Sequence, residues 1–335
     1  MLTITDHLPD GLLHVGARDL YRVLDGPTLL CLPGRRAAPL FVSVLLHGNE
    51  DTGLGAVQAV LRRHARRGLP RSLAILFGNV AAAREGLRHR DGEPDFNRIW
   101  PGAETDGLAE HAMAHAVVAE IAARGPFAAI DIHNNTGLNP RYACVNRLDA
   151  PFLQLAILFS RIVVYFTRPL GVLTAAFAPL CPSVAVECGK PGNAAAEAHA
   201  AELIDACLHL DHFPVHAIAP RDIDLYHTLG IVRIPVDVRF GFEHNGVDLR
   251  LETDLDRLNF QDLPAGTPIG YAPAGRAIPL EVRDESGALV TEQYFEVRAG
   301  VIRTRRAVMP AMLTRDERVI RQDCLCYLME RLRME

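Results

Sequence analysis

The chain has 335 residues, which is enough to bury the core of one large domain or of two smaller ones. Hydrophobic residues make up 49% and charged residues 22%, an ordinary composition for a soluble globular protein, and no window of about eighteen residues is uninterruptedly apolar. With a net charge of −5 and no basic stripe, neither nucleic acid nor a membrane is an expected partner.

Seven cysteines are scattered without a CxxC pair, which favours buried thiols in a reducing compartment. The first residues, MLTITDHLPDG, include acidic side chains and lack the basic segment and apolar run of a secretory signal. A cytoplasmic location is therefore expected. Lys190 is the single lysine among the 35 basic residues, so an arginine in this chain is informative only through its position.

The first two-thirds of the chain alternate short apolar runs with longer helical patterns. Apolar runs that alternate with helices indicate an α/β fold, with a mixed, mostly parallel sheet flanked by helices. Buried strands are predicted at 40–47, 72–79, 126–133, 161–166 and 182–187, and helices at 51–66, 106–123, about 150–161, and after a capping Asn193.

The pattern changes near residue 213. From there short β-rich runs are punctuated by Pro and Gly, and helical periodicity nearly disappears. The sequence therefore predicts two domains, an α/β domain over residues 1–212 and a smaller β-rich domain over residues 213–335.

His47 and Glu50 form an HxxE pair, HGNE, where a predicted strand ends and a helix begins. In an open α/β sheet, ligands bind outside the carboxyl ends of the strands, and this spacing lets both side chains converge on one ion. The alternative is a histidine bonded to a loop carbonyl and a glutamate favoured by the helix dipole.

Two further predicted strands end in chemically active side chains. Asp131-Ile132-His133 ends one, and Glu187 ends another. Two histidines and one carboxylate leave a position open for water in a catalytic zinc site, so His133 is a candidate third ligand beside the HxxE pair. A buried carboxylate beside such a site is suited to act as a general base. Taken singly, Glu187 is also explained as a helix-capping or turn carboxylate, and His133 is better explained as an ordinary strand-end histidine.

A loop after the second predicted strand carries Arg88 and the run Asp95-Phe96-Asn97-Arg98. Asn97 and Arg98, side by side, can hold a carboxylate through directed hydrogen bonds. Each arginine alone is more simply a solvated surface residue. Three strand ends and one loop with such side chains at one sheet edge nevertheless indicate a functional site.

Taken in order, HGNE, NRIWPG, DIHNNTG and VECG resemble the motifs of the succinylglutamate desuccinylase/aspartoacylase family, a branch of the zinc carboxypeptidase fold. The motifs cover roughly residues 40–190, and the β-rich C-terminal part is similar to the second domain of that family. The resemblance implies a zinc-hydrolase domain over residues 1–212 that cleaves the amide bond of a small N-acyl amino acid.

The resemblance also implies roles for the residues that could bind metal or transfer protons. His47, Glu50 and His133 would hold one zinc ion per chain, and Glu187 would activate the attacking water.

Further roles concern the substrate. Arg88 would polarise the acyl carbonyl, with Arg84 and Arg90 as rivals, because the loop that follows is longer than in the family pattern. Asn97 and Arg98 would bind the α-carboxylate of the amino-acid product.

One segment departs from the family. LTAAFAPLCPS, before the strand that ends at Glu187, contains no basic residue where aspartoacylase holds the aspartate side chain. Phe177 lies near that place, so the sequence predicts an apolar wall there and a substrate other than N-acetylaspartate.

Two other functions are weighed against the deacylase. A carboxypeptidase-type exopeptidase shares every motif but needs an open cleft for a peptide. A non-catalytic metal-binding protein needs no spare carboxylate such as Glu187, and a structural zinc site is closed by four protein ligands. A small molecule is the expected partner, and the sequence leaves open whether the protein is a homo-oligomer.

Overall fold

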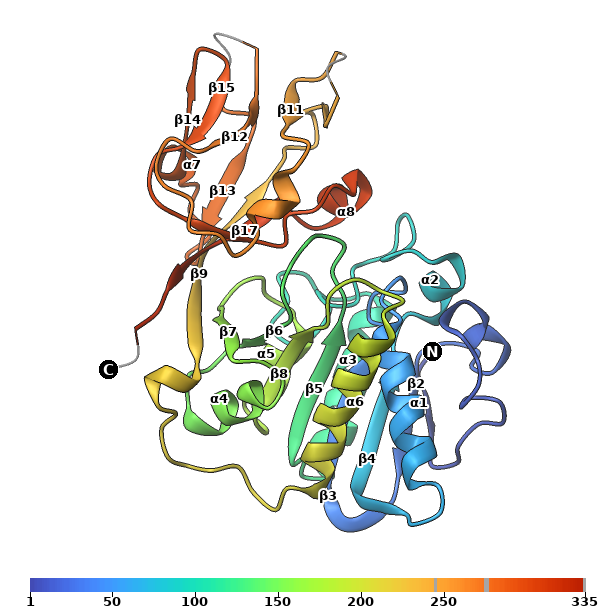
Figure 1. Cartoon of the computed structure of the whole chain (residues 1–335). Coiled ribbons are helices and arrows are strands. Elements are labelled where there is room, and N and C mark those ends of the chain that lie inside the picture. Colours follow the sequence, from blue (N-terminus) through green and yellow to red (C-terminus); the bar gives the residue numbers. More distant parts are fainter. Residues whose placement is uncertain (244–245, 274–276, 334–335) are drawn as a thin grey trace. The chain divides into compact units, whose positions relative to one another are not determined.

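The computed structural model describes residues 1–243, 246–273 and 277–333 (Figure 1). The chain forms two compact units. The first comprises Met1–Asn134 and Arg141–Asp224, and the second comprises Asn135–Pro140 and Leu225–Glu335. No helix in the described part of the chain is long and apolar enough to cross a membrane.

The division between the units lies at Asp224, later than the boundary near residue 213 that the sequence predicted. The intervening segment packs on the first unit. The ring of Phe213 is buried and stacks on Phe127, with 4.8 Å between the ring centroids. Burial of this aromatic ring holds the segment with the first unit, although its sequence lacks helical periodicity.

The first unit is built on a mixed, mostly parallel sheet, as the sequence predicted. Its strand order is β1-β2-β4-β3-β5-β8-β6-β7. The β2–β4 and β8–β6 pairs are antiparallel, and the other pairs are parallel. The strands are Thr3–Thr5 (β1), Thr28–Leu32 (β2), Gly34–Val44 (β3), Leu69–Phe77 (β4), Ala128–His133 (β5), Tyr142–Val145 (β6), Ile162–Tyr165 (β7) and Ser183–Glu187 (β8).

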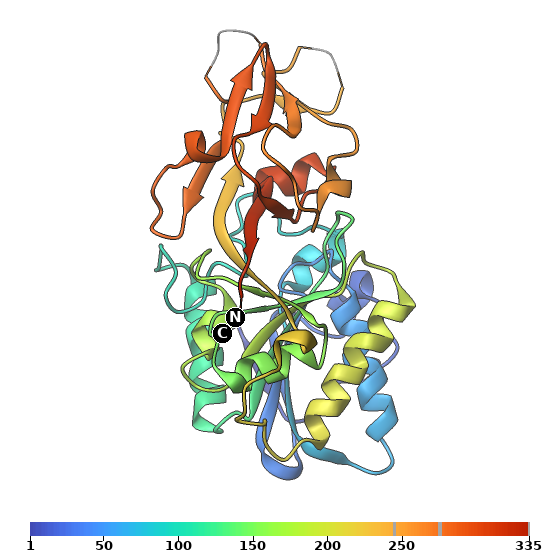
Figure 2. The ribbon, with the colours of Figure 1, turned by 60° about the vertical axis from the view of Figure 1, so that its left-hand side comes forward.

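Helices cover both faces of this sheet. The turned view of Figure 2 shows the blue α1 and the yellow α6 on one face and the blue-green α3 on the other. The α6 N-terminus is capped as predicted, because the side chain of Asn193 accepts hydrogen bonds from the backbone N–H groups of Ala195 and Ala196. The helices are Thr52–His64 (α1), Val80–Glu85 (α2), Ala109–Ala123 (α3), Ala150–Ile157 (α4), Leu173–Phe177 (α5) and Ala194–His209 (α6), with 3-10 helices at Ala17–Arg22 and Pro220–Asp222.

The core on the α3 side of the sheet includes three aromatic rings. Phe41 of β3 stacks on Phe177 of α5 with 4.6 Å between ring centroids, and Trp100 meets Phe177 edge-on at 6.1 Å. Phe177 has no exposed surface. The prediction that Phe177 forms the wall of a substrate pocket is therefore wrong, because the ring lies between α5 and the sheet and has no exposed face to offer a ligand.

The second unit is β-rich, as predicted. Its smaller sheet has the order β10-β11-β12-β15-β14, and β9 pairs antiparallel with β13 and with β17, which in turn pairs with β16. The buried side chains of Leu249, Phe295 and Ile302 belong to its core. The strands are Asp224–Arg233 (β9), Phe240–Gly241 (β10), Leu249–Leu251 (β11), Pro268–Tyr271 (β12), Glu281–Asp284 (β13), Phe295–Arg298 (β14), Val301–Thr304 (β15), Met309–Ala311 (β16) and Cys326–Arg331 (β17), with short helices at Leu255–Leu258, Thr291–Tyr294 (α7) and Glu317–Gln322 (α8).

Candidate metal centre

The HxxE pair lies in a tight loop between β3 and α1. β3 ends at Val44, and Leu45 takes a left-handed conformation with φ of 58°. A Cβ on Gly48 would collide with the backbone of Ala82 and Ala83 in the middle of α2. Glycine is therefore required by this close approach, which holds the loop against α2.

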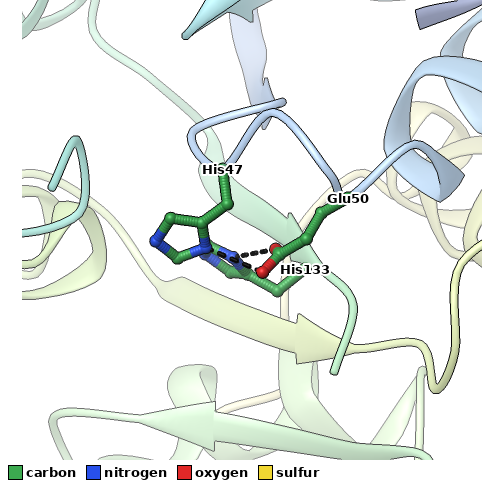
Figure 3. A group of neighbouring side chains, drawn as sticks. All are labelled: His47, Glu50 and His133. Atoms are coloured by element: carbon green, nitrogen blue, oxygen red, sulfur yellow. Dashed lines mark hydrogen bonds and ion pairs between the residues drawn. The ribbon is translucent and has the colours of Figure 1, made fainter. Parts of the chain in front are cut away.

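His47, Glu50 and His133 converge at one point, as predicted (Figure 3). His47 Nδ1 lies 2.8 Å from Glu50 Oε1, and His133 Nδ1 lies 2.8 Å from Glu50 Oε2. One ligand atom from each residue lies within 4.8 Å of the others, and all three side chains are buried. Among the described residues this is the one group of three or more histidine, cysteine or carboxylate side chains that could hold a metal ion.

The far nitrogen of each histidine ring meets a second carboxylate. His47 Nε2 lies 3.0 Å from Asp95 Oδ1, and His133 Nε2 lies 2.7 Å from Asp131 Oδ2. A carboxylate on one ring nitrogen can fix the tautomer and the orientation of the ring, and this leaves the Nδ1 lone pair available to a metal. These donors therefore fit a divalent cation that takes imidazole and carboxylate ligands.

No role for Asp95 or Asp131 was predicted from the sequence. The alternation of side chains along a strand places Asp131 and His133 on one face of β5, so this pair could have been found from the sequence. Asp95 is 48 residues from His47 in the chain, and no local pattern links the two.

The electrostatics of the cluster favour positive charge. Burial and a neighbouring arginine oppose protonation of His47, but Glu50 and Asp95 outweigh them, so the pKa of His47 is raised. Burial also opposes protonation of His133, yet Asp131 and Glu50 raise its pKa well above the usual value. Burial would raise the pKa of Glu50, but the two histidines lower it. An anionic cluster of this kind stabilises a bound cation as it stabilises the imidazolium.

Arg88 is directed at this cluster. Its Nε and Nη2 donate to Asp95 Oδ2 at 3.2 and 2.8 Å, and its Nη1 lies 3.9 Å from Glu50 Oε1. Burial would raise the pKa of the Asp95 carboxyl, but Arg88 and His47 hold it well below the usual value. The guanidinium is therefore fixed next to the candidate metal ligands by a buried ion pair.

The two rival arginines are engaged away from the cluster. The guanidinium of Arg84 lies over the ring of Tyr21, at 4.3 Å from the centroid. Arg90 donates to Glu93 Oε1 at 3.0 Å near the surface. Of these three arginines, Arg88 is therefore the one that lies next to the cluster.

Asn97 also contacts the cluster. Its Oδ1 accepts a hydrogen bond from Leu173 N at 3.0 Å, which fixes the orientation of the amide, and its Nδ2 lies 3.2 Å from His133 Nε2. Arg98 is half-buried beside it and donates from Nη1 to Asn97 O at 2.7 Å. The structure thus brings Asn97 into contact with a candidate ligand and Arg98 next to Asn97.

Glu187 is the last residue of β8 and the register partner of His133 on β5. Partners on adjacent parallel strands project from the same face of a sheet, so the two side chains are neighbours. Glu187 is buried, with 9% of its surface exposed. A carboxylate is thus placed directly beside a candidate metal ligand.

Known proteins share this fold. The chain is similar to a succinylglutamate desuccinylase from Chromobacterium violaceum, at 18% identity and a TM-score of 0.57 over 90% of this chain and 86% of the other. It is also similar to murine aminoacylase 3, at 15% identity and a TM-score of 0.58 over 90% and 97%. For a succinylglutamate desuccinylase from Vibrio cholerae the values are 14% and 0.59, over 97% and 98%.

No family model matches the sequence, and no curated protein matches it either. At these identities the solved structures establish the fold. The resemblance drawn from the four sequence motifs is thereby confirmed at the level of the fold, which is that of succinylglutamate desuccinylase/aspartoacylase family structures.

Proposed function

We propose that this protein is a zinc-dependent amidohydrolase that releases the amino acid from a small N-acyl amino acid. The observation that supports it most is the buried His47, Glu50 and His133 cluster with Glu187 in register beside it. The fold is shared with succinylglutamate desuccinylases and with aminoacylase 3. Both names describe removal of an acyl group from an amino acid.

Zinc is the metal that two imidazoles and a carboxylate hold in many catalytic sites, with one position left for water or substrate. Lewis acidity, which lowers the pKa of a water and polarises a carbonyl, is the chemistry that such an ion supplies when bound. His47, Glu50 and His133 would hold it, with Asp95 and Asp131 orienting the two rings.

The remaining side chains divide the proton transfer and the substrate contacts. Glu187 takes a proton from the attacking water and passes it to the leaving amine. Arg88 donates to the oxygen on which negative charge develops. Asn97 and Arg98 hold the α-carboxylate through charge-assisted hydrogen bonds. No covalent acyl-enzyme is needed.

A panel of N-acyl amino acids with one acyl group and varied side chains tests the proposal. We expect zinc-dependent release of the free amino acid. Residues 173–183, where the resemblance places the contact to an acidic substrate side chain, contain no basic residue. An unpaired buried carboxylate is costly. Substrates with neutral and apolar side chains should therefore match or exceed those with Asp and Glu in kcat/KM.

Three outcomes would contradict parts of this assignment. A preference of about tenfold or more for N-acetylaspartate would show that a cation reaches the side-chain pocket, since one charge-assisted hydrogen bond is worth about this factor. Release of C-terminal residues from peptides, without deacylation, would identify an exopeptidase. Bound zinc without hydrolysis of either class would identify a non-catalytic metal protein.

A further inference from the structure

Asn134, the residue after His133, is a buried side chain whose two polar atoms are both engaged. Its Oδ1 accepts from Thr52 N at 3.2 Å. Its Nδ2 donates to Thr52 Oγ1 at 2.9 Å and to Gly189 O at 2.7 Å. Its backbone N–H donates to Glu50 Oε2 at 3.1 Å. Only 3% of the residue is exposed, and both N–H groups of its amide are bonded within the protein, so the side chain has no free donor to offer a substrate.

These bonds join three segments of the candidate site. Thr52 begins α1, two residues after the candidate ligand Glu50. Gly189 lies two residues after Glu187, the candidate general base. Asn134 itself follows the candidate ligand His133. One amide therefore connects the metal-binding loop, the metal-binding strand and the chain that leaves the base.

The segment after Glu187 needs such a tie because regular pairing ends there. The last register pair between β5 and β8 is His133 with Glu187, and Cys188 N donates to His133 O at 2.9 Å. Beyond this point Gly189 takes a left-handed conformation with φ of 86° and the chain leaves the sheet. The bond from Asn134 Nδ2 is thus the next tie along the loop.

A second side chain, from the loop between Glu50 and α1, also binds the segment after Glu187. Asp51, between Glu50 and Thr52, accepts a hydrogen bond from Gly192 N at 3.1 Å. Residues 188–193 are therefore fixed at two points by side chains that neighbour candidate metal ligands. Only an amide at position 134 supplies an acceptor for Thr52 N together with donors for Thr52 Oγ1 and Gly189 O.

We propose that Asn134 is a positioning residue that sets the Glu187 carboxylate against the metal ligands by tying residues 188–193 to the start of α1. The catalytic part of this inference rests on the proposed function, in which Glu187 is the base. Loss of the amide should lower kcat and leave KM and metal content nearly unchanged, because no ligand and no substrate contact is removed.

The first experiment compares Asn134→Ala with a matched control, Gln58→Ala. Gln58 is also a buried amide, on α1, and its Nε2 donates to Leu12 O at 2.8 Å and to Val15 O at 2.7 Å, away from the cluster. We expect a fall in kcat of about tenfold or more for Asn134→Ala, with KM within about threefold, and kcat within about twofold for Gln58→Ala.

A double-mutant cycle separates positioning from a general structural effect. In a Glu187→Gln background, Asn134→Ala should lower kcat by a further factor of less than about three, because the base that Asn134 positions is already lost. Independent, multiplicative losses would overturn the proposal. Should Asn134→Ala fail to fold, Asn134→Asp keeps an acceptor for Thr52 N, removes both donors and adds a negative charge.

A second readout requires no activity. Lys190 is exposed, lies in the tied segment and is the only lysine, so reductive ¹³C-methylation labels it and the N-terminal amine alone. Asn134→Ala should shift and sharpen the Lys190 methyl NMR signal, and Gln58→Ala should not. A shifted signal in a protein that hydrolyses no N-acyl amino acid would contradict the proposed function but support the role of Asn134 in fixing residues 188–193. An unchanged signal would show that Asn134 does not fix residues 188–193.

Discussion

Replacement of Glu187 by glutamine is expected to lower kcat by about 10²–10⁴-fold, the usual loss when a general base is removed. The amide is isosteric with the carboxylate and can still accept a hydrogen bond, but it cannot take a proton from water. Because Glu187 is not one of the three clustered ligands, zinc content and thermal stability should stay close to those of the wild type.

A second carboxylate provides the control. Glu197 of α6 is half-buried, lies outside the metal cluster and has a pKa that is raised, chiefly by burial. Glu197→Gln should leave kcat within about twofold, because this carboxylate touches no candidate ligand. Turnover by Glu187→Gln above about a tenth of the wild-type value would mean that another group serves as the base.

The variants His47→Ala and His133→Ala are each expected to lose most of the bound zinc, from about one ion per chain. Each removes one of three protein ligands, and two ligands rarely retain zinc through dialysis. Metal analysis after dialysis measures the effect. His64→Ala is the control, because the His64 ring of α1, 2.6 Å from Asp205 Oδ1 of α6, forms a histidine–carboxylate pair outside the cluster. Full metal in both cluster variants would contradict the assignment.

The same site predicts how zinc affinity changes with pH. In the metal-free protein the pKa values of His47 and His133 are raised, against the effect of burial, by the carboxylates around them. Below these raised values zinc must displace a proton from each ring, so the apparent affinity should rise with pH, by up to about two log units per pH unit, and level off above them. Zinc affinity that is constant between about pH 6 and 8 would contradict this, since this is where histidines titrate.

Much of the α/β unit could be predicted from the sequence because its strands are continuous apolar runs. The apolar runs in β3, β4, β5 and β8 are buried on both faces, so these strands could be recognised in the sequence. β2 and β6 were not predicted, although they are as long as β8 and β7, which were. The helix α5 was not predicted either, because its five residues do not complete two helical turns.

The candidate ligands were predictable because strand ends collect at one sheet edge, so His47, Glu50, His133 and Glu187 could be placed together without coordinates. Interactions between distant segments could not be placed in this way. The ion pair of Arg88 with Asp95 and the ties of Asn134 depend on how loops fold back. The misplacement of Phe177 has the same origin, because composition alone does not show which face of a short helix meets the sheet.

Titration of the metal-free protein with zinc, with release of the free amino acid from an N-acyl amino acid as the readout, tests the zinc-deacylase assignment most directly. Activity should be absent without metal, rise in proportion to added zinc and level off at about one ion per chain, as a single catalytic site requires. Full activity in the metal-free protein, or none at any zinc stoichiometry, would contradict it.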